Sequence, residues 1–347
     1  MVSVGDILYG KYQVTSVLQP GDFGQVFRVF NFGMGRNSVI KMVPAKDPTV
    51  MKELIEAYSA HLCNHDNVVD IYACEVAQVS DKFGALVPGI VMELEDVAAG
   101  SLQNAITSGH MPLRQSVKLI KDVLYAVQFA HSKQIIHGDI KPDNIFIGPH
   151  GAKLADFGLA KNNNLIGITR AQKSFYVTHG APELFAGNDI DASSDIFAAG
   201  MTLYRAANNI VDWQAYVFGV ANANVYLQKG TLIKKLGYSH ELPSALRKIV
   251  NKACAPLPNL RFKSCSSFRE ALEKLRFQSE WKKVAPDQWV SDLPGRCESV
   301  QLIVRSKVFE VEYKLNGRRQ SKHCAQLAVR RDADAFMHRI IAETTLA

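Results

Sequence analysis

The sequence predicts an α+β chain with three successive parts: a small β-rich part, a larger helical part and a small βββα unit. In residues 12–93, β-like runs alternate with one helical stretch, whereas residues 97–277 are mostly helical in pattern. Strand-like alternation returns from about Trp281. The 347 residues suggest one large or two modest domains, and the 47% hydrophobic content can fill a sizeable core.

The first part contains a glycine-bearing turn between two strand-like runs. Gly21 and Gly24 lie in this turn, and because they have no Cβ, backbone N–H groups there can approach a phosphate closely. Lys41 follows in the hydrophobic run at residues 38–43. A helix is expected within residues 50–62, and residues 89–94 are typical of a strand that runs into a hinge.

The helical part contains a clear amphipathic helix at residues 113–131. Its apolar residues recur at helical spacing, namely Val117, Ile120, Val123, Leu124, Val127 and Ala130. The helix ends just before residues 137–144. Asp139 is therefore expected at a rigid junction between a helix and a loop.

Residues 137–144, read together with the Asp-Phe-Gly triplet at 156–158, indicate phosphate chemistry. A phosphate-transferring site needs a carboxylate to orient a hydroxyl nucleophile and oxygen ligands to hold magnesium against a triphosphate. Asp139 suits the first role, and Asn144 and Asp156 suit the second. At average composition this combination of fixed positions would occur by chance on the order of once in a billion placements.

These motifs, taken in order, resemble those of the eukaryotic-type protein kinases. The opening at residues 5–14 resembles that of bacterial eukaryotic-like Ser/Thr kinases. The resemblance extends from about Tyr12 to about Phe277. It implies a two-lobed protein-kinase fold with a small β-rich N-lobe at residues 12–93 and a larger helical C-lobe at 97–277. We therefore expect a kinase domain at residues 1–278 and an accessory α+β domain at 279–347.

The resemblance also implies roles for individual residues. Asp139 would orient the substrate hydroxyl and accept its proton, and Lys141 would neutralise charge on the γ-phosphate of ATP. Lys41 would contact the α- and β-phosphates and pair with Glu56 on the following helix, with Glu53 as the alternative partner.

The same resemblance defines a nucleotide site and a metal site. Gly21 and Gly24 would position the phosphates, and backbone groups near Glu93 to Glu95 would meet adenine. The side chains expected around the base are Met92, guarding the pocket behind it, and Val26, Val39 and Phe146, enclosing the ring. Asn144 and Asp156 would hold Mg²⁺, with Mn²⁺ as an alternative metal.

Further anchors follow the catalytic motifs. The Ala-Pro-Glu triplet at residues 181–183 matches the end of the activation segment, and Arg261 matches the arginine that pairs with Glu183. Asp195 matches the aspartate that holds the catalytic loop from below. Thr178 is the candidate for the threonine that hydrogen-bonds toward that loop.

The sequence departs from the family pattern at three informative positions. Gln19 replaces the first glycine of the loop, and Val39 replaces a common alanine, which should lower the roof of the pocket slightly. Gly138 stands where many such kinases carry an arginine that binds a phosphate on the activation segment. Because glycine has no side chain for this, we expect catalysis without phosphorylation of that segment.

The predicted function is transfer of the ATP γ-phosphoryl group to Ser or Thr hydroxyls of proteins, since Lys141 lies two residues after Asp139 as in Ser/Thr kinases. The alternatives are a dual-specificity or tyrosine kinase, and a pseudokinase scaffold that acts by binding. Intact Lys41, Asp139, Asn144 and Asp156 disfavour the scaffold, whereas Gln19 and the unusual segment near Thr178 favour it.

The last part is expected to form three strands and a helix. Residues 300–304 and 309–315 read as strands, the dipeptide at 316–317 as a two-residue hairpin turn, and 325–329 as a third strand. Asp332 is expected to cap the final helix. We expect a docking or regulatory role for residues 279–347. Nucleic-acid binding by their basic residues is the less favoured alternative.

Composition agrees with a cytoplasmic protein. No uninterrupted apolar segment is long enough to span a bilayer, and the N-terminus lacks the basic and apolar regions of a signal peptide. The six cysteines form no CxxC pair. The net charge of +7 fits acidic or phosphorylated partners, but a solvated surface explains it equally well.

Overall fold

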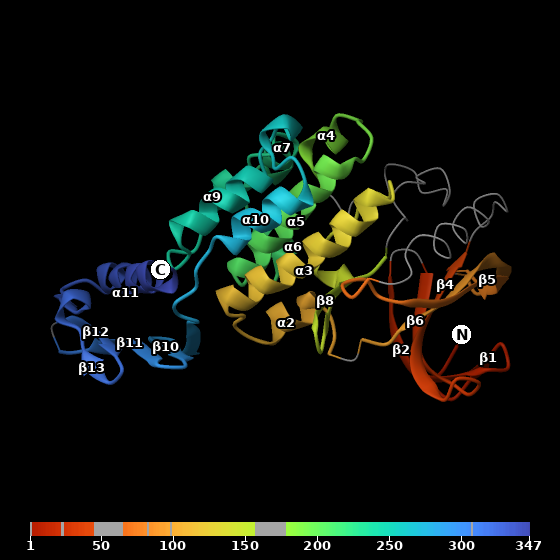
Figure 1. Cartoon of the computed structure of the whole chain (residues 1–347), viewed down its shortest axis with the longest axis horizontal. Helices are drawn as coiled ribbons and strands as arrows, with labels where there is room; N and C mark the ends of the chain where they lie inside the picture. Colours follow the sequence, from red (N-terminus) through yellow and green to blue (C-terminus); the bar gives the residue numbers. More distant parts are fainter. Residues whose placement is uncertain are drawn as a thin grey trace. The chain divides into compact units, whose positions relative to one another are not determined.

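The computed structural model describes residues 2–21, 24–44, 65–81, 83–97, 99–156, 178–306 and 308–347 (Figure 1). The chain forms two compact units. The first unit contains Met1–Ser101, Tyr125–Asp139 and Asn144–Tyr176, and the second contains Leu102–Leu124, Ile140–Asp143 and Val177–Ala347.

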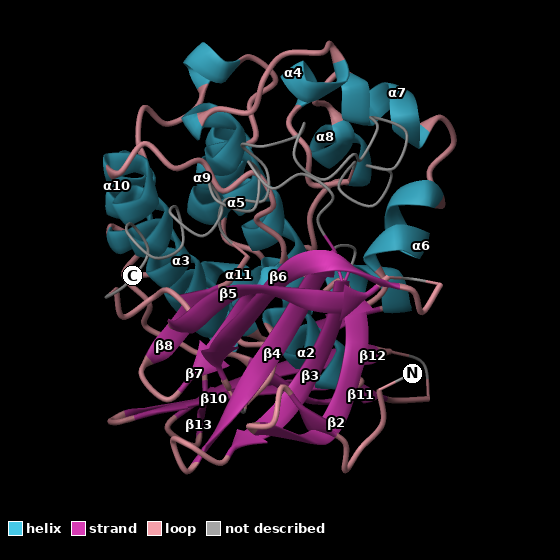
Figure 2. Ribbon diagram, turned by 90° about the vertical axis from the view of Figure 1, so that its right-hand side faces the viewer, coloured by secondary structure: helices cyan, strands magenta, loops and turns pink. Residues whose placement is uncertain are grey.

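The first unit contains a six-stranded antiparallel sheet with the strand order β1-β2-β3-β4-β6-β5 (Figure 2). The strands are β1 (Ile7–Leu8), β2 (Tyr12–Gly21), β3 (Gly24–Asn31), β4 (Arg36–Pro44), β5 (Ile71–Ser80) and β6 (Leu86–Glu95). The β-rich first part is therefore confirmed. The predicted helix at residues 50–62 lies outside the described residues.

The two faces of this sheet differ because side chains alternate along each strand. One face carries a hydrophobic core made by Tyr12, Val14, Phe27, Val29, Ile40, Met42, Val79 and Val91. On the opposite face, the side chains of Val26, Lys41 and Met92 form a row across β3, β4 and β6, because Val26 pairs with Lys41 and Lys41 pairs with Met92. Val39 belongs to the next row on this second face, beside Leu94.

A short hairpin follows in the same unit, formed by β7 (Ile145–Gly148) and β8 (Gly151–Leu154). Phe146 on β7 packs with Leu94 against the small cluster of Val69, Val97 and Ala155. Along the chain, the hairpin follows the polar residues at 137–144 and precedes Ala155 and Asp156.

The second unit is rich in helices. They are α2 (Leu102–Ser108), the first part of α3 (Leu113–Ser132), α4 (Pro182–Phe185), α5 (Ala192–Ala207), α6 (Trp213–Phe218), α7 (Ala223–Gln228), α8 (Leu232–Leu236), α9 (Ser244–Ala253) and α10 (Cys265–Glu273). The helix predicted at residues 113–131 is confirmed as α3. The mostly helical pattern predicted for residues 97–277 is also confirmed for the residues of this range that the structure describes.

Helix α5 is the most deeply buried element of this unit. Asp191 caps its N-terminus by accepting from Ser194 N, and the Ser194 hydroxyl in turn accepts from Asp191 N. A Cβ added to Gly200 would lie 2.7 Å from Ala253 Cβ and from Cys254 Sγ. Glycine therefore allows α9 to approach α5 closely at this point.

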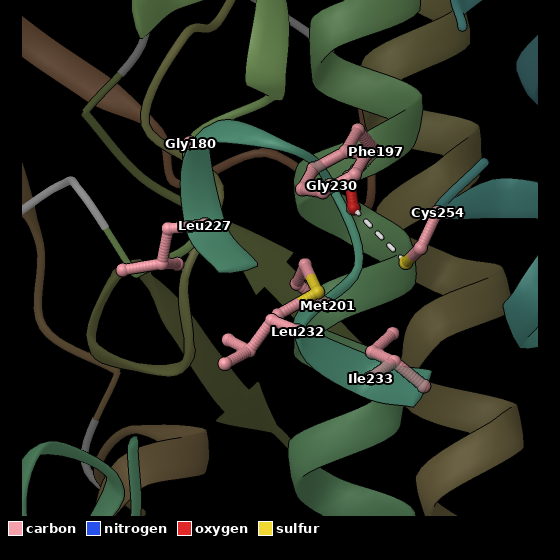
Figure 3. A pocket seen from close by; sticks show the side chains of 8 residues that line it. All are labelled: Gly180, Phe197, Met201, Leu227, Gly230, Leu232, Ile233 and Cys254. Atoms are coloured by element: carbon pink, nitrogen blue, oxygen red, sulfur yellow. Dashed lines mark hydrogen bonds between the residues drawn. The ribbon is translucent and has the colours of Figure 1, made fainter. Parts of the chain in front are cut away.

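A small apolar pocket lies among α5, α7, α8 and the end of α9 (Figure 3). It is lined by Gly180, Phe197, Met201, Leu227, Gly230, Leu232, Ile233 and Cys254. Cys254 Sγ donates a 3.7 Å hydrogen bond to the Phe197 carbonyl, so the thiol is already used within the wall.

The last part of the second unit forms a sheet in the order β13-β12-β11-β10-β9, with β14 paired to β12. Its elements are β9 (Lys282–Ala285), β10 (Gln288–Leu293), β11 (Arg296–Val304), β12 (Phe309–Leu315), β13 (Arg318–Arg319), β14 (Ala325–Leu327) and α11 (Arg330–Thr345). Asn316 and Gly317 join β12 to β13 with positive φ angles of 48° and 76°, as the hairpin signal predicted.

Two details of the predicted βββα unit are wrong. The prediction missed β9, β10 and β13. Polar Ser291 occupies a buried position in β10 and hides its alternation, whereas β9 is exposed along its whole length and β13 has only two residues. The cap of α11 is Val329, and Asp332 lies within the first turn instead. A carboxylate in the first turn still interacts favourably with the helix dipole.

Candidate active site

The loop at residues 137–144 is fixed by a buried histidine. His137 is fully buried, and its Nε2 lies 2.9 Å from the Ala155 carbonyl oxygen. Asp139 N donates to His137 Nδ1 at 3.1 Å. Because a carbonyl can only accept, the proton lies on Nε2 and Nδ1 is the acceptor. The motif contained this histidine, but sequence reasoning assigned it no role.

Asp139 is oriented by Asn144. The Asn144 side-chain Nδ2 donates to the Asp139 main-chain oxygen at 2.9 Å and to Asp139 Oδ2 at 2.7 Å. Both partners are acceptors, so the amide nitrogen must face Asp139 and the amide oxygen must point elsewhere. Gly138, between the histidine and the aspartate, has a φ of 74°, which glycine adopts at little cost.

Lys41 and Asp156 form an ion pair beside these residues. Lys41 Nζ lies 2.5 Å from Asp156 Oδ1, and the lysine side chain is only 6% exposed. Asp156 has a φ of 62°, which is uncommon for a residue other than glycine. The preceding residue, Ala155, donates its N–H to the Asn144 carbonyl at 2.9 Å. Lys41, Asp139, Asn144 and Asp156 are therefore all held in the first unit.

The apolar residues predicted around a base lie in two places within the first unit. Val26 and Val39 are half-buried on the same sheet face as Lys41 and Met92. Phe146 is half-buried on the β7–β8 hairpin. Glu56 and its alternative Glu53 lie outside the described residues.

The glycine turn joins β2 to β3, where Gly21 pairs with Gly24. A Cβ on Gly24 would lie 1.9 Å from the Met42 carbonyl oxygen. Its φ of 155° is also one that residues with a Cβ rarely adopt. The sheet itself therefore requires glycine at this position, in addition to the close phosphate approach that the sequence indicated.

The segment at Glu93–Glu95 belongs to the end of β6. Glu95 N donates to the Asp70 carbonyl at 2.9 Å, and its carboxylate accepts from Lys153 Nζ at 2.7 Å. Glu93 is buried and accepts hydrogen bonds from Tyr12 and Asn31. Sequence reasoning missed these partners, since they lie far from Glu93 along the chain.

Comparison with known proteins identifies the family. The family model described as the protein kinase domain matches residues 12–274. The chain belongs to the protein kinase family. Proteins of this family use ATP together with a divalent metal and act on protein substrates.

The curated relatives of this kinase chain are named serine/threonine-protein kinases. PknA of Mycobacterium tuberculosis is 25% identical over 289 residues, which cover 79% of this chain and 63% of PknA. PknB of Mycobacterium leprae is 31% identical over 208 residues, which cover 57% of this chain and 32% of PknB. The kinase chain thus matches less than two thirds of the length of either relative.

A solved structure supports the kinase fold. The kinase domain of Mycobacterium tuberculosis PknI superposes with a TM-score of 0.57 at 19% identity. The match covers 79% of this chain and 98% of the PknI domain. In the described part of the kinase chain, no helix has the length and apolar character needed to cross a bilayer.

The end of the kinase activation segment is anchored within the second unit. Arg261 is almost fully buried and makes two 2.6 Å hydrogen bonds to the Glu183 carboxylate, which confirms the predicted pair. The guanidinium also donates to the carbonyls of Ser193 and Ala255 at 3.0 and 2.9 Å. Asp195 lies fully buried in α5. Residues 157–177 of the segment lie outside the described residues.

Two buried polar residues precede this anchor. Thr178 Oγ1 lies 3.5 Å from His179 Nδ1, and the His179 ring packs on Trp213 with 5.4 Å between ring centroids. Burial, followed by the charges of Arg205 and Lys141, lowers the pKa of His179 to about 3. The ring is therefore neutral at ordinary pH, and the charge of Lys141, which the sequence singled out, contributes to this.

Proposed function

We propose that this chain is an ATP-dependent protein kinase that phosphorylates Ser and Thr hydroxyls of proteins. The observation that carries the proposal is the grouping of Lys41, Asp139, Asn144 and Asp156 in one unit, with the Asp139 carboxylate oriented by Asn144. A carboxylate held in this way suits a group that must accept a proton in a fixed direction. The names of the relatives support the choice of Ser and Thr.

The donor set fits Mg²⁺, which prefers oxygen ligands and often takes one or two carboxylates together with substrate phosphates. Asn144 directs its amide oxygen away from Asp139, and Asp156 contributes a carboxylate. Among the described residues, no group of three or more His, Cys, Asp or Glu side chains is arranged to hold a metal alone. A bound Mg²⁺ would neutralise charge on the β- and γ-phosphates, and Mn²⁺ is the alternative ion.

In the proposed reaction, the substrate hydroxyl oxygen forms a bond to the γ-phosphorus while the bond from that phosphorus to the β–γ bridging oxygen breaks. Asp139 orients the hydroxyl and takes its proton, and ADP leaves with the bridging electron pair. Lys141 neutralises charge that develops on the γ-phosphoryl group, and Lys41 holds the α- and β-phosphates. Gly21 and Gly24 position the phosphates, and adenine is expected at the Glu93–Glu95 segment, in which Glu95 N already donates to the Asp70 carbonyl.

We propose further that activity does not depend on phosphorylation of the activation segment. Gly138 has no side chain that could bind a phosphate there, and its φ of 74° disfavours any other residue. Thr178, one of the hydroxyls near the end of the segment, is buried and thus a poor acceptor in this conformation. Thr169, Ser174 and Tyr176 lie outside the described residues.

The test is transfer of label from γ-labelled ATP to dephosphorylated casein by phosphatase-treated protein. We expect label on serine and threonine, linear in time from the start, and a loss of about 10²–10⁴-fold in Asp139→Asn. Label on tyrosine alone would indicate a tyrosine kinase, and no label on any protein would indicate a scaffold. A lag that disappears after pre-incubation with ATP would refute activation-independent catalysis.

We propose that residues 279–347 form an accessory domain that docks a partner or regulates the kinase. Its own core includes Trp281, Trp289 and Val300. Arg305 and Arg319 both form ion pairs with Glu310 at 3.1 Å, so part of the positive charge of the sheet is neutralised locally. A protein partner is therefore favoured over nucleic acid.

Shortening the chain to residues 1–280 tests this division. The accessory part contacts the helices through the rings of Trp289 and His110, which lie 4.9 Å apart, and through a 4.0 Å contact of His338 with Glu241. The end of α11 is also bonded to the connecting residues 276–279, for example by the bridge between Phe277 and Leu346 and by Ala347 N, which donates to the Arg276 carbonyl at 2.8 Å. The accessory part has a core of its own, so we expect the shortened protein to stay folded and bind ATP but to lose a partner or regulatory response. Melting curves with and without ATP provide the measurement. Unfolding of the shortened protein would show that these residues are integral to the kinase fold.

A further inference from the structure

Trp289 of the accessory part lies between two histidine rings. It belongs to β10 and is only 3% exposed. The ring of His110 meets it edge to face with 4.9 Å between centroids, and the ring of His338 does so at 6.4 Å. Among the described residues, the buried Trp289 Nε1 has no hydrogen-bond partner. The contact between this indole and His110 is therefore one of ring packing.

The two histidines come from opposite sides of a junction within the second unit. His110 lies between α2 and α3 of the kinase helices, whereas His338 belongs to α11 of the accessory part. The His110 ring also forms a hydrogen bond with the main chain of Trp281. His110 is thus a kinase residue that contacts both tryptophans of the accessory part.

The loop that carries His110 is fixed on the kinase side as well. Met111 N donates to Asn209 Oδ1 at 2.6 Å, and Asn209 Nδ2 donates back to the Met111 carbonyl at 3.2 Å. Asn209 follows α5, and α3 begins at Leu113. The kinase helices therefore hold His110 in place by its neighbour, and its ring remains available to hold the accessory part.

A positive charge on His110 would weaken this junction. Burial disfavours the charged ring most, and Lys283, whose Nζ lies 5.8 Å from the Trp289 ring centroid, adds a second positive charge. Glu241 and the bond to Trp281 act in the opposite direction, but the pKa of His110 still lies below its usual value. Because a released His110 would be solvated and free of this cost, protonation favours release.

His338 opposes this effect only weakly. A protonated His338 would attract Glu241, but the two atoms lie 4.0 Å apart and the side chains are 26% and 24% exposed. Ion pairs that water reaches contribute little. The charge on His110 therefore decides the direction.

We propose that a histidine latch, in which Trp281 and Trp289 hold neutral His110, docks the accessory part on the kinase helices and is opened by acid. This inference deepens the role proposed above for residues 279–347 and rests on it. Release takes up one proton, so docking is complete above the usual pKa of histidine, about 6.5, and weakens as the pH falls below it. The ratio of docked to released protein would change by up to about tenfold per pH unit.

Release would be a rotation of the accessory part and would leave its fold intact. Gln278 N donates to the Thr345 carbonyl at 3.0 Å, so the connecting residues are bonded to the end of α11 and would move with it. The core of the accessory part is made of its own residues, and neither His110 nor Glu241 belongs to it. The helices and strands should therefore persist in the released form.

Small-angle X-ray scattering of the full chain between about pH 7.5 and about pH 5.5 tests the latch. We expect the radius of gyration of the wild type to rise as the pH falls, while the far-UV circular dichroism stays constant. His110→Phe keeps a ring against Trp289 but cannot be protonated, so it should stay compact over the whole range. His150→Phe is the matched control and should behave as the wild type, because His150 is exposed in the turn between β7 and β8.

Lys283→Met guards against a failure of His110→Phe to fold or to dock. Lys283 is exposed on β9, and its loss removes one of the two positive charges at Trp289, so release should move to lower pH. A wild type that stays compact in acid would overturn the inference, as would equal expansion of His110→Phe or an expansion that coincides with loss of helical signal.

Label transfer to casein separates the latch from the role on which it rests. At a pH where only the wild type is open, we expect its rate to differ from that of His110→Phe. Equal rates would contradict a regulatory role of the accessory part and leave the latch standing. A wild type without any label transfer at neutral pH would contradict the kinase proposal instead.

Discussion

Replacing Lys41 with methionine or Asp156 with asparagine is expected to lower phosphoryl transfer by about a thousandfold or more, since each removes a charge aimed at the phosphates or the metal. Nucleotide-free protein should respond differently in the two variants. Lys41→Met leaves the partly buried Asp156 carboxylate without its 2.5 Å partner and should cost about 1–3 kcal/mol of stability. Asp156→Asn keeps a hydrogen-bond acceptor for Lys41 and should cost less.

The measurement is label transfer together with thermal unfolding. Lys11→Met is the control for removal of a lysine, since Lys11 is 42% exposed and pairs with Glu75 on the protein surface. We expect that variant to retain activity and stability, as exposed ion pairs contribute little. Turnover at the wild-type level in either site variant would refute the assignment of Lys41 and Asp156 to catalysis.

Gly24→Val should have the second-largest effect. Its Cβ would lie 1.9 Å from the Met42 carbonyl, so β3 and β4 would have to separate next to Lys41. We expect the KM for ATP to rise about tenfold or more and the melting temperature to fall, because displaced strands cost packing as well as phosphate contacts. Steady-state kinetics over a range of ATP concentrations and a melting curve give both quantities.

Two comparison variants make this result specific. Gly109→Val is a matched control, because a Cβ there meets nothing within 4 Å and the backbone is not in the left-handed region. Gln19→Gly should change activity little, since Gly21 and Gly24 already provide the close backbone approach and Pro20 limits the freedom of the loop. If Gly24→Val leaves ATP use unchanged, the glycine turn does not position phosphates.

Local motifs explain which features the sequence could predict. Helix α3 follows from a periodic apolar pattern over twenty residues, and the hairpin at Asn316 and Gly317 follows from two adjacent residues that tolerate positive φ. Asp139 and Asn144 lie five residues apart, so one short motif contains both. Such features depend on neighbours in the chain and are therefore visible in a single sequence.

Long-range contacts explain what the sequence could not reveal. The partners of Glu93 lie 62 and 81 residues away, and nothing near any of the three residues marks them as a set. The same is true of Gly24, whose critical neighbour Met42 belongs to another strand. Strand β10 was missed because the core there is partly polar. Ser291 pairs with the buried Glu298 on β11, and Tyr313 Oη donates to the Glu298 carboxylate at 2.6 Å.

The buried ring of His179 gives the kinase an intrinsic sensitivity to acid. The folded protein holds this imidazole neutral down to a pH of about 3, whereas an unfolded chain would protonate it below about 6.5. Unfolding therefore takes up a proton between these two values, and stability is lost as the pH falls from 6.5 toward 3, by about 1.4 kcal/mol per pH unit. A loss of activity at acid pH would then reflect a smaller fraction of folded protein. This effect would be separate from any protonation of Asp139.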